Sequence, residues 1–134
     1  MATLRSRTIS VAIDRAPADV YAYVYDAANM PRWATAFVRA IRQDGDGWIV
    51  ETPDGVMPLR FVPRNELGVL DHTVTVSPGQ DVLNPMRVVP NGGGSEVLFT
   101  VFQLPGMSDE RFAVDCGYVQ HDLRALKTVL EGAG

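Results

Sequence analysis

The chain has 134 residues, enough for one domain with a sizeable core. Its formal net charge of -4 provides no basic surface for nucleic acid, and no apolar run approaches the ~20 residues of a membrane span. The single cysteine, Cys116, excludes an internal disulfide. We therefore expect one cytoplasmic domain, residues 1–134, that neither binds nucleic acid nor inserts into a membrane; a homodimer is left open.

The first elements expected along the chain are a strand and a helix. Residues 7–14 alternate apolar and polar side chains, which predicts a strand with one buried face. Pro17 suits a first helical turn and begins a stretch with apolar residues at helical spacing. Pro31 disfavours helix in the residue before it, so this helix should stop around Asn29. A short second turn or helix should follow.

Residues 36–104 consist of short apolar runs separated by turn signals, which is typical of an antiparallel meander. The turn signals are DGDG at 44–47, PDG at 53–55, ELG at 66–68, SPG at 77–79 and NGGG at 91–94. Their spacing predicts six strands. The NGGG segment is interpreted as a hairpin turn and not a phosphate loop, because no Gly-Lys-Ser/Thr follows it.

The last segment predicts a long amphipathic helix. Ser108 is a good N-cap, and Gly132 ends the run. Its apolar residues recur at steps of three and four and should pack against the sheet: Phe112, Cys116, Val119, Leu123, Leu126 and Leu130.

A second strip of small and polar residues follows one flank of this helix, at Ala113, Cys116, Gly117 and Gln120. Glycine inside a helix costs about 1 kcal/mol relative to alanine. Gly117 therefore requires either a close backbone approach or a space left open beside the helix, and both alternatives stay open.

The stretch ISVAIDRAPADVYAYVYDAANMPRW resembles the opening of the SRPBCC superfamily, which includes START lipid-transfer domains, birch-pollen-type allergens and bacterial polyketide cyclase/dehydrase-like proteins. The matching positions are Ala16, Pro17, Asp19, Val20, Asp26, Asn29 and Trp33. The resemblance implies an α+β helix-grip fold: a curved seven-stranded antiparallel sheet wrapped around a long C-terminal helix, with two short helices between strands 1 and 2. It also implies a cavity between sheet and helix. The chain is much shorter than a full START domain, as bacterial members are, so a smaller apolar or aromatic ligand is expected.

The segment GVLDHTVTV places Asp71 beside His72 in a predicted strand. Consecutive side chains point to opposite faces, so His72 should face inward with Leu70 and Val74, and Asp71 outward. The two therefore cannot form a catalytic dyad. His72 is interpreted either as a satisfied core residue or as a polar anchor in the cavity.

Other candidate lining residues come from several segments. Asn84 is assigned inward although both faces of its strand are apolar, and Phe99 is favoured over the opposite face because Glu96 belongs with that face. The C-terminal helix is expected to contribute Cys116 and Gln120. Met30 and Trp33 either cover the mouth of the cavity or pack in the core.

Three functions remain open. The first is a carrier or sensor that binds a small hydrophobic or aromatic molecule through His72, Asn84, Phe99 and their neighbours. The alternative is a polyketide cyclase or dehydratase in which His72 acts as the acid/base, and the third is regulation by protein contact. No metal site and no cofactor are expected, because Cys116, His72 and His121 are too few and too scattered.

Overall fold

The computed structural model describes residues 2–132. Its elements, in chain order, are β1 (Ser6–Ile13), α1 (Pro17–Tyr25), the 3₁₀ helix η1 (Ala27–Asn29), α2 (Met30–Trp33), β2 (Ala40–Asp44), β3 (Gly47–Thr52), β4 (Gly55–Phe61), β5 (His72–Ser77), β6 (Gln80–Asn84), β7 (Met86–Asn91), β8 (Gly94–Phe102) and α3 (Asp109–Gly132). Within these residues, no helix is both long enough and apolar enough to cross a membrane.

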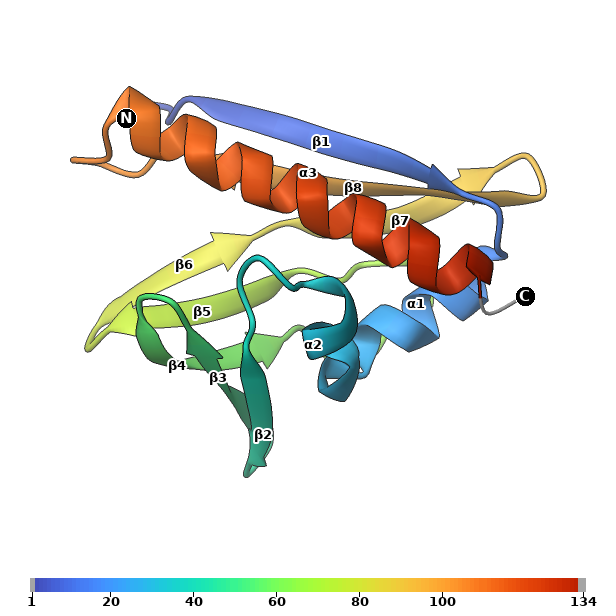
Figure 1. The fold of residues 1–134 in the computed structure, drawn as a ribbon, viewed down its shortest axis with the longest axis horizontal. Helices are drawn as coiled ribbons and strands as arrows, with labels where there is room; N and C mark the ends of the chain where they lie inside the picture. The colour runs from blue at the N-terminus through green and yellow to red at the C-terminus, as the bar shows by residue number, and fades with distance from the viewer. Residues whose placement is uncertain (1, 133–134) are drawn as a thin grey trace.

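The strands form two antiparallel ladders, one of three strands in the order β1-β8-β7 and one of five in the order β2-β3-β4-β5-β6. Helix α3 runs along the three-stranded part and contacts β1, β8 and α2 (Figure 1). The five-stranded part extends below the helix without comparable contact to it. This α+β arrangement, with a long C-terminal helix and antiparallel strands, confirms the predicted fold class.

The strand count differs from the predicted seven because of Pro85. The structure divides the expected strand at 82–89 into β6 and β7, one on each side of this residue. Proline has no backbone N–H and so cannot continue a ladder as a donor. Before Pro85 the chain pairs with β5, and after it with β8, which joins the two ladders at a bend. Counted as one bent strand, β6 and β7 restore the predicted seven.

The first helix ends earlier than predicted. Helix α1 stops at Tyr25 instead of near Asn29, and the Asp26 carboxylate accepts a hydrogen bond from the Ala28 backbone N–H at 3.2 Å. An aspartate side chain that binds a backbone N–H two residues on favours a turn over a continued helix. The chain continues through η1, which Asp26 caps, and then forms α2, with Pro31 in its first turn, where proline is tolerated.

The long helix is as predicted, and it carries much of the core. The Ser108 hydroxyl accepts a hydrogen bond from the Arg111 backbone N–H at 3.1 Å, so Ser108 caps the N-terminus of α3. Leu123 and Leu126 are at most 1% exposed and belong to the same buried cluster as Val24 and Val97. The hydrophobic stripe therefore fixes α3 against the three-stranded part of the sheet.

Candidate functional site

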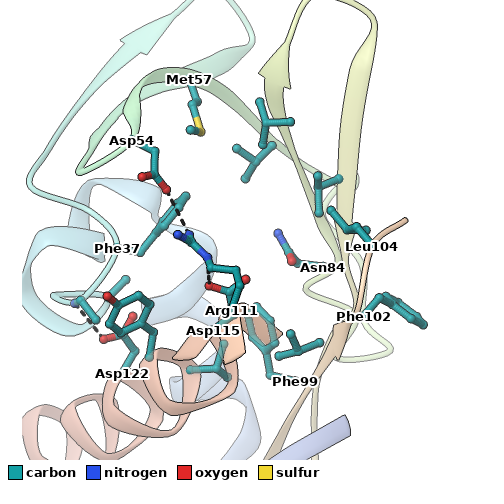
Figure 2. A pocket seen from close by; sticks show the side chains of 18 of the residues that line it. Phe37, Asp54, Met57, Asn84, Phe99, Phe102, Leu104, Arg111, Asp115 and Asp122 are labelled. Atoms are coloured by element: carbon teal, nitrogen blue, oxygen red, sulfur yellow. Dashed lines mark hydrogen bonds and ion pairs between the residues drawn. The ribbon is translucent and has the colours of Figure 1, made fainter. Parts of the chain in front are cut away.

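A cavity of about 750 Å³ lies between α3 and the curved strands. Its walls come from α2 and the segment after it, the β3–β4 turn, β5, β6, β8, the β8–α3 loop and one side of α3 (Figure 2). Several lining residues are also exposed to solvent, and we call the part of the wall formed by Asp54, Gln80, Gly106, Arg111 and Tyr118 the mouth.

His72 lies at the inner end of the cavity and is only 5% exposed. Its Nδ1 is 3.0 Å from the Leu70 carbonyl oxygen, and its ring lies against Phe61 and Phe99, with centroids 5.1 and 5.6 Å away. Burial lowers the pKa of His72, because desolvation of the charged form outweighs the Leu70 hydrogen bond and the charge of Asp71. The imidazole is therefore neutral near pH 7.

Asp71 faces away from His72, as the strand alternation predicts. Its Oδ1 accepts a hydrogen bond from the Met86 backbone N–H at 2.8 Å and lies 3.9 Å from Nε of Arg87. The carboxylate thus anchors the bend that follows Pro85. The two neighbours form no acid–imidazole dyad.

Asn84 stands directly opposite His72 in the β5–β6 ladder. Opposed residues in an antiparallel pair share one face of the sheet, so both side chains point to the cavity side. Figure 2 shows the Asn84 amide directed into the cavity. Its side chain makes no hydrogen bond to any residue from 2 to 132, although the amide has both an acceptor oxygen and an NH₂ donor.

A charged group spans the mouth. Arg111 on α3 donates from Nη2 to Asp54 Oδ2 in the β3–β4 turn at 3.2 Å, and from Nε to Asp115 Oδ1 at 2.9 Å (Figure 2). Asp115 raises the pKa of Arg111 most strongly, with a smaller contribution from Asp54. The pKa of Asp115 is nevertheless raised, because its desolvation outweighs the ion pair.

Asp122 is a buried acid in the cavity wall, with a side chain 9% exposed. Its Oδ1 accepts hydrogen bonds from the Ala36 backbone N–H at 3.0 Å and lies 3.1 Å from His121 Nδ1. Burial raises the pKa of Asp122 more than these contacts lower it. The contact to Ala36 ties the segment between α2 and β2 to α3.

Five of the seven predicted ligand-binding residues line this cavity: Met30, Trp33, His72, Asn84 and Phe99. Phe99 and Val101 line the cavity from one face of β8, and Phe102 and Leu104, from the other alternating set, join the wall where the strand ends. Whether any of them binds a ligand or acts in catalysis stays a prediction.

Cys116 and Gln120 do not line the cavity, which corrects the expectation for α3. Cys116 is 1% exposed within the core, and Gly117 is exposed with open space where a Cβ would stand. The apolar stripe has two flanks, and the small-residue strip lies on the one that faces away from the cavity.

The lining side of α3 is instead the more polar flank, with Arg111, Asp115, Tyr118, Val119 and Asp122. The sequence did contain a signal for Asp122, which stands three residues after Val119 and four before Leu126 in the apolar stripe. No comparable signal identified Asp54, because its partner Arg111 is 57 residues away. Among residues 2–132, no group of three or more His, Cys, Asp or Glu side chains could hold a metal ion.

Known proteins resemble this chain in sequence pattern and in fold. A family model described as polyketide cyclase / dehydrase and lipid transport matches residues 5–131. No curated protein sequence matches the chain.

Solved structures share the fold at low identity. A START superfamily protein from Mycobacterium smegmatis is 13% identical, with a TM-score of 0.73 and coverage of 96% of this chain and 99% of that one. Ara h 8.0201 is 17% identical, with a TM-score of 0.70 and coverage of 97% and 99%. The di-domain ARO/CYC protein BexL, from the BE-7585A biosynthetic pathway, is 17% identical, with a TM-score of 0.72; the match covers 96% of this chain and 47% of BexL.

Proposed function

Because the chain belongs to the polyketide cyclase / dehydrase and lipid-transport family, we propose that it binds a small hydrophobic or aromatic molecule in the cavity beneath α3. The cavity itself supports this proposal. Its volume of about 750 Å³ lies inside the range of roughly 300–1,000 Å³ typical of small-molecule sites. A carrier or sensor needs this space and no catalytic group.

The chemistry of the wall agrees with such a ligand. Met30, Met57, Val74, Phe99 and Val101 provide apolar surface from four elements, α2, β4, β5 and β8. A few polar groups among many apolar ones are the usual composition of sites that orient a hydrophobic molecule.

A neutral fluorescent probe tests the proposal directly. N-phenyl-1-naphthylamine should bind the purified protein with one-to-one stoichiometry and an increase in fluorescence. Val82→Phe adds volume inside the cavity and should weaken binding at least tenfold. Val89→Phe, at an exposed position of β7, is the matched control and should leave binding unchanged. Absence of saturable binding, or equal effects of the two variants, would refute the proposal.

The alternative function is enzymatic, and the neutral His72 ring with an unpartnered Nε2 is the observation that favours it. A neutral imidazole with a free Nε2 can accept a proton from the carbon next to a ketone, leaving an enolate that is reprotonated from solvent. The structure provides no carboxylate on its Nδ1, which binds the Leu70 carbonyl.

Hydrogen–deuterium exchange measures this step without knowledge of the natural substrate. With 2-tetralone in D₂O, an enzyme should accelerate exchange at the α-carbons, and His72→Phe should abolish the acceleration. Exchange at the solvent rate in wild type, with the ketone shown to be bound, would rule out the proton abstraction and leave the carrier function intact.

Regulation by protein contact has less support. Three of the exposed large apolar side chains, Val76, Leu83 and Tyr118, line the cavity already described, and the others, Leu4, Val56, Leu67, Val89 and Val114, come from different elements and loops. A partner surface normally gathers such residues into one patch.

A further inference from the structure

We propose that the cavity selects a neutral, hydroxyl-bearing apolar molecule over an anionic one, with the hydroxyl bound between His72 and Asn84. The inference rests on the proposed binding function and specifies the chemistry of the ligand. It is carried by two partnerless polar groups, His72 Nε2 and the Asn84 amide, and by the charged residues of the cavity wall.

The first of these groups is an acceptor. A carbonyl oxygen can only accept a hydrogen bond, so the Nδ1 of His72 carries the proton that the Leu70 carbonyl binds. In a neutral ring, Nε2 then has a lone pair and no proton. This atom is the distal nitrogen of a side chain that is 5% exposed, and it has no hydrogen-bond partner within the described residues. It therefore offers an acceptor to a ligand O–H.

The second group can serve the same ligand oxygen. Cβ atoms of opposed residues such as His72 and Asn84 are about 4.5–5.5 Å apart. The Asn84 amide points into the cavity, and its N–H groups have no partner in residues 2–132. One hydroxyl can donate to His72 Nε2 and accept from Asn84 Nδ2 at the same time, which satisfies both groups.

A carboxylate fits this pair poorly. It has no proton to give to Nε2, and its negative charge would face the imidazole lone pair. Burial keeps the ring neutral, so it provides no compensating positive charge.

The charged residues of the cavity wall add to the exclusion of anions. The charged lining residues are three carboxylates, Asp54, Asp115 and Asp122, and one guanidinium, Arg111. Arg111 is paired with both Asp54 and Asp115, and these two carboxylates offset its positive charge. An anion would therefore meet a wall with more acidic than basic side chains.

Three probes that share one ring system test the selectivity: naphthalene, 2-naphthol and 2-naphthoate, each measured by displacement of N-phenyl-1-naphthylamine at pH 7.5. Net hydrogen bonds contribute about 0.5–1.5 kcal/mol each, so the two bonds together should make 2-naphthol bind about 5- to 160-fold tighter than naphthalene. We expect 2-naphthoate to bind at least tenfold more weakly than 2-naphthol.

Two substitutions locate the preference. His72→Phe keeps an aromatic ring between Phe61 and Phe99 but removes the acceptor, and Asn84→Leu removes the amide at similar size. Each removes one of the two hydrogen bonds and should lower the ratio of 2-naphthol to naphthalene affinity by about 2- to 13-fold, while naphthalene itself is retained. Asn91→Leu, at the exposed end of β7, is the matched control and should keep the wild-type ratio.

The outcomes distinguish a failure of this selectivity from a failure of the proposed binding function. Wild-type protein that binds naphthalene and 2-naphthol equally, or prefers 2-naphthoate, overturns the selectivity and leaves hydrophobic binding in place. Wild-type protein that binds none of the three overturns both. If His72→Phe does not fold, as judged by circular dichroism, the wild-type series and Asn84→Leu still decide the matter.

Discussion

The ion pair across the mouth should slow the release of a bound molecule. Arg111 joins α3 to the β3–β4 turn through Asp54, and this turn is itself held by Thr52, whose hydroxyl donates to the Gly55 carbonyl and accepts from the Asp54 N–H. A ligand that leaves between helix and turn has to separate Arg111 from Asp54. Asp54→Asn removes that attraction and keeps the size of the side chain.

The magnitude follows from the exposure of the pair. The two side chains are 50% and 57% exposed, and ion pairs of this kind contribute about 0.2–1 kcal/mol. If the pair is broken in the transition state for release, the same energy leaves the barrier, which makes release about 1.4- to 5-fold faster. The effect on the free energy of unfolding should stay below about 1 kcal/mol.

Stopped-flow dissociation of N-phenyl-1-naphthylamine measures this rate. Added salt screens exposed charges, so wild-type release should accelerate with ionic strength, and release from Asp54→Asn should respond less. Asp19→Asn, on α1, breaks a partly exposed pair with Arg15, which precedes that helix, and serves as the control. Equal release rates in wild type and Asp54→Asn, or an equal change in Asp19→Asn, would refute the reasoning.

Three further predictions concern stability. His72 has a lowered pKa in the folded state, so the neutral ring contributes its full stability above about pH 6.5, and this stability is lost as the pH falls below that value. In denaturant titrations, the free energy of unfolding should therefore fall more steeply with acid in wild type than in His72→Phe. Asp122 has a raised pKa in the folded state, so its ionisation destabilises the fold. This loss of stability is absent below the pKa of the unfolded state and complete above the pKa of the folded state. Asp122→Asn should therefore stabilise the protein at pH 7, and the gain should disappear in acid. Leu126→Ala removes a fully buried side chain and should cost about 2–5 kcal/mol, whereas Val114→Ala, 45% exposed on the same helix, should cost less than about 0.5 kcal/mol in thermal or chemical unfolding.

Local patterns predicted most of the elements, because each depends on its own residues, whereas their arrangement in a helix-grip fold came from the family resemblance. The alternation at 7–14, the glycine turns and the stripe on the last helix are properties of neighbouring positions. The errors arose where two local effects compete. Asp26 ends α1 with a side-chain hydrogen bond that a helical stripe does not reveal, and Pro85 divides a strand that alternation alone makes continuous.

The inner end of the cavity was partly accessible to the same reasoning. Alternation placed His72 inward, because its strand has one clearly apolar face. Alternation could not determine which way the Asn84 side chain faces, since both faces of that strand are apolar. What brings the amide beside the imidazole is the register of β5 with β6, and that register depends on the turn at 77–79 and its bulge.

The wall on α3 shows the limit of periodicity most clearly. A helical pattern identifies the buried stripe, but a stripe has two flanks, and only the neighbouring elements decide which one faces a void. Here α2 and the segment after it reach Asp122, and the β3–β4 turn reaches Arg111, so the polar flank closes over the cavity. Small residues such as Gly117 suggested an open space beside the helix, and the open side of Gly117 faces solvent and not the cavity. A buried acid within an apolar stripe was the better indicator, because a carboxylate is rarely placed there unless hydrogen bonds satisfy it.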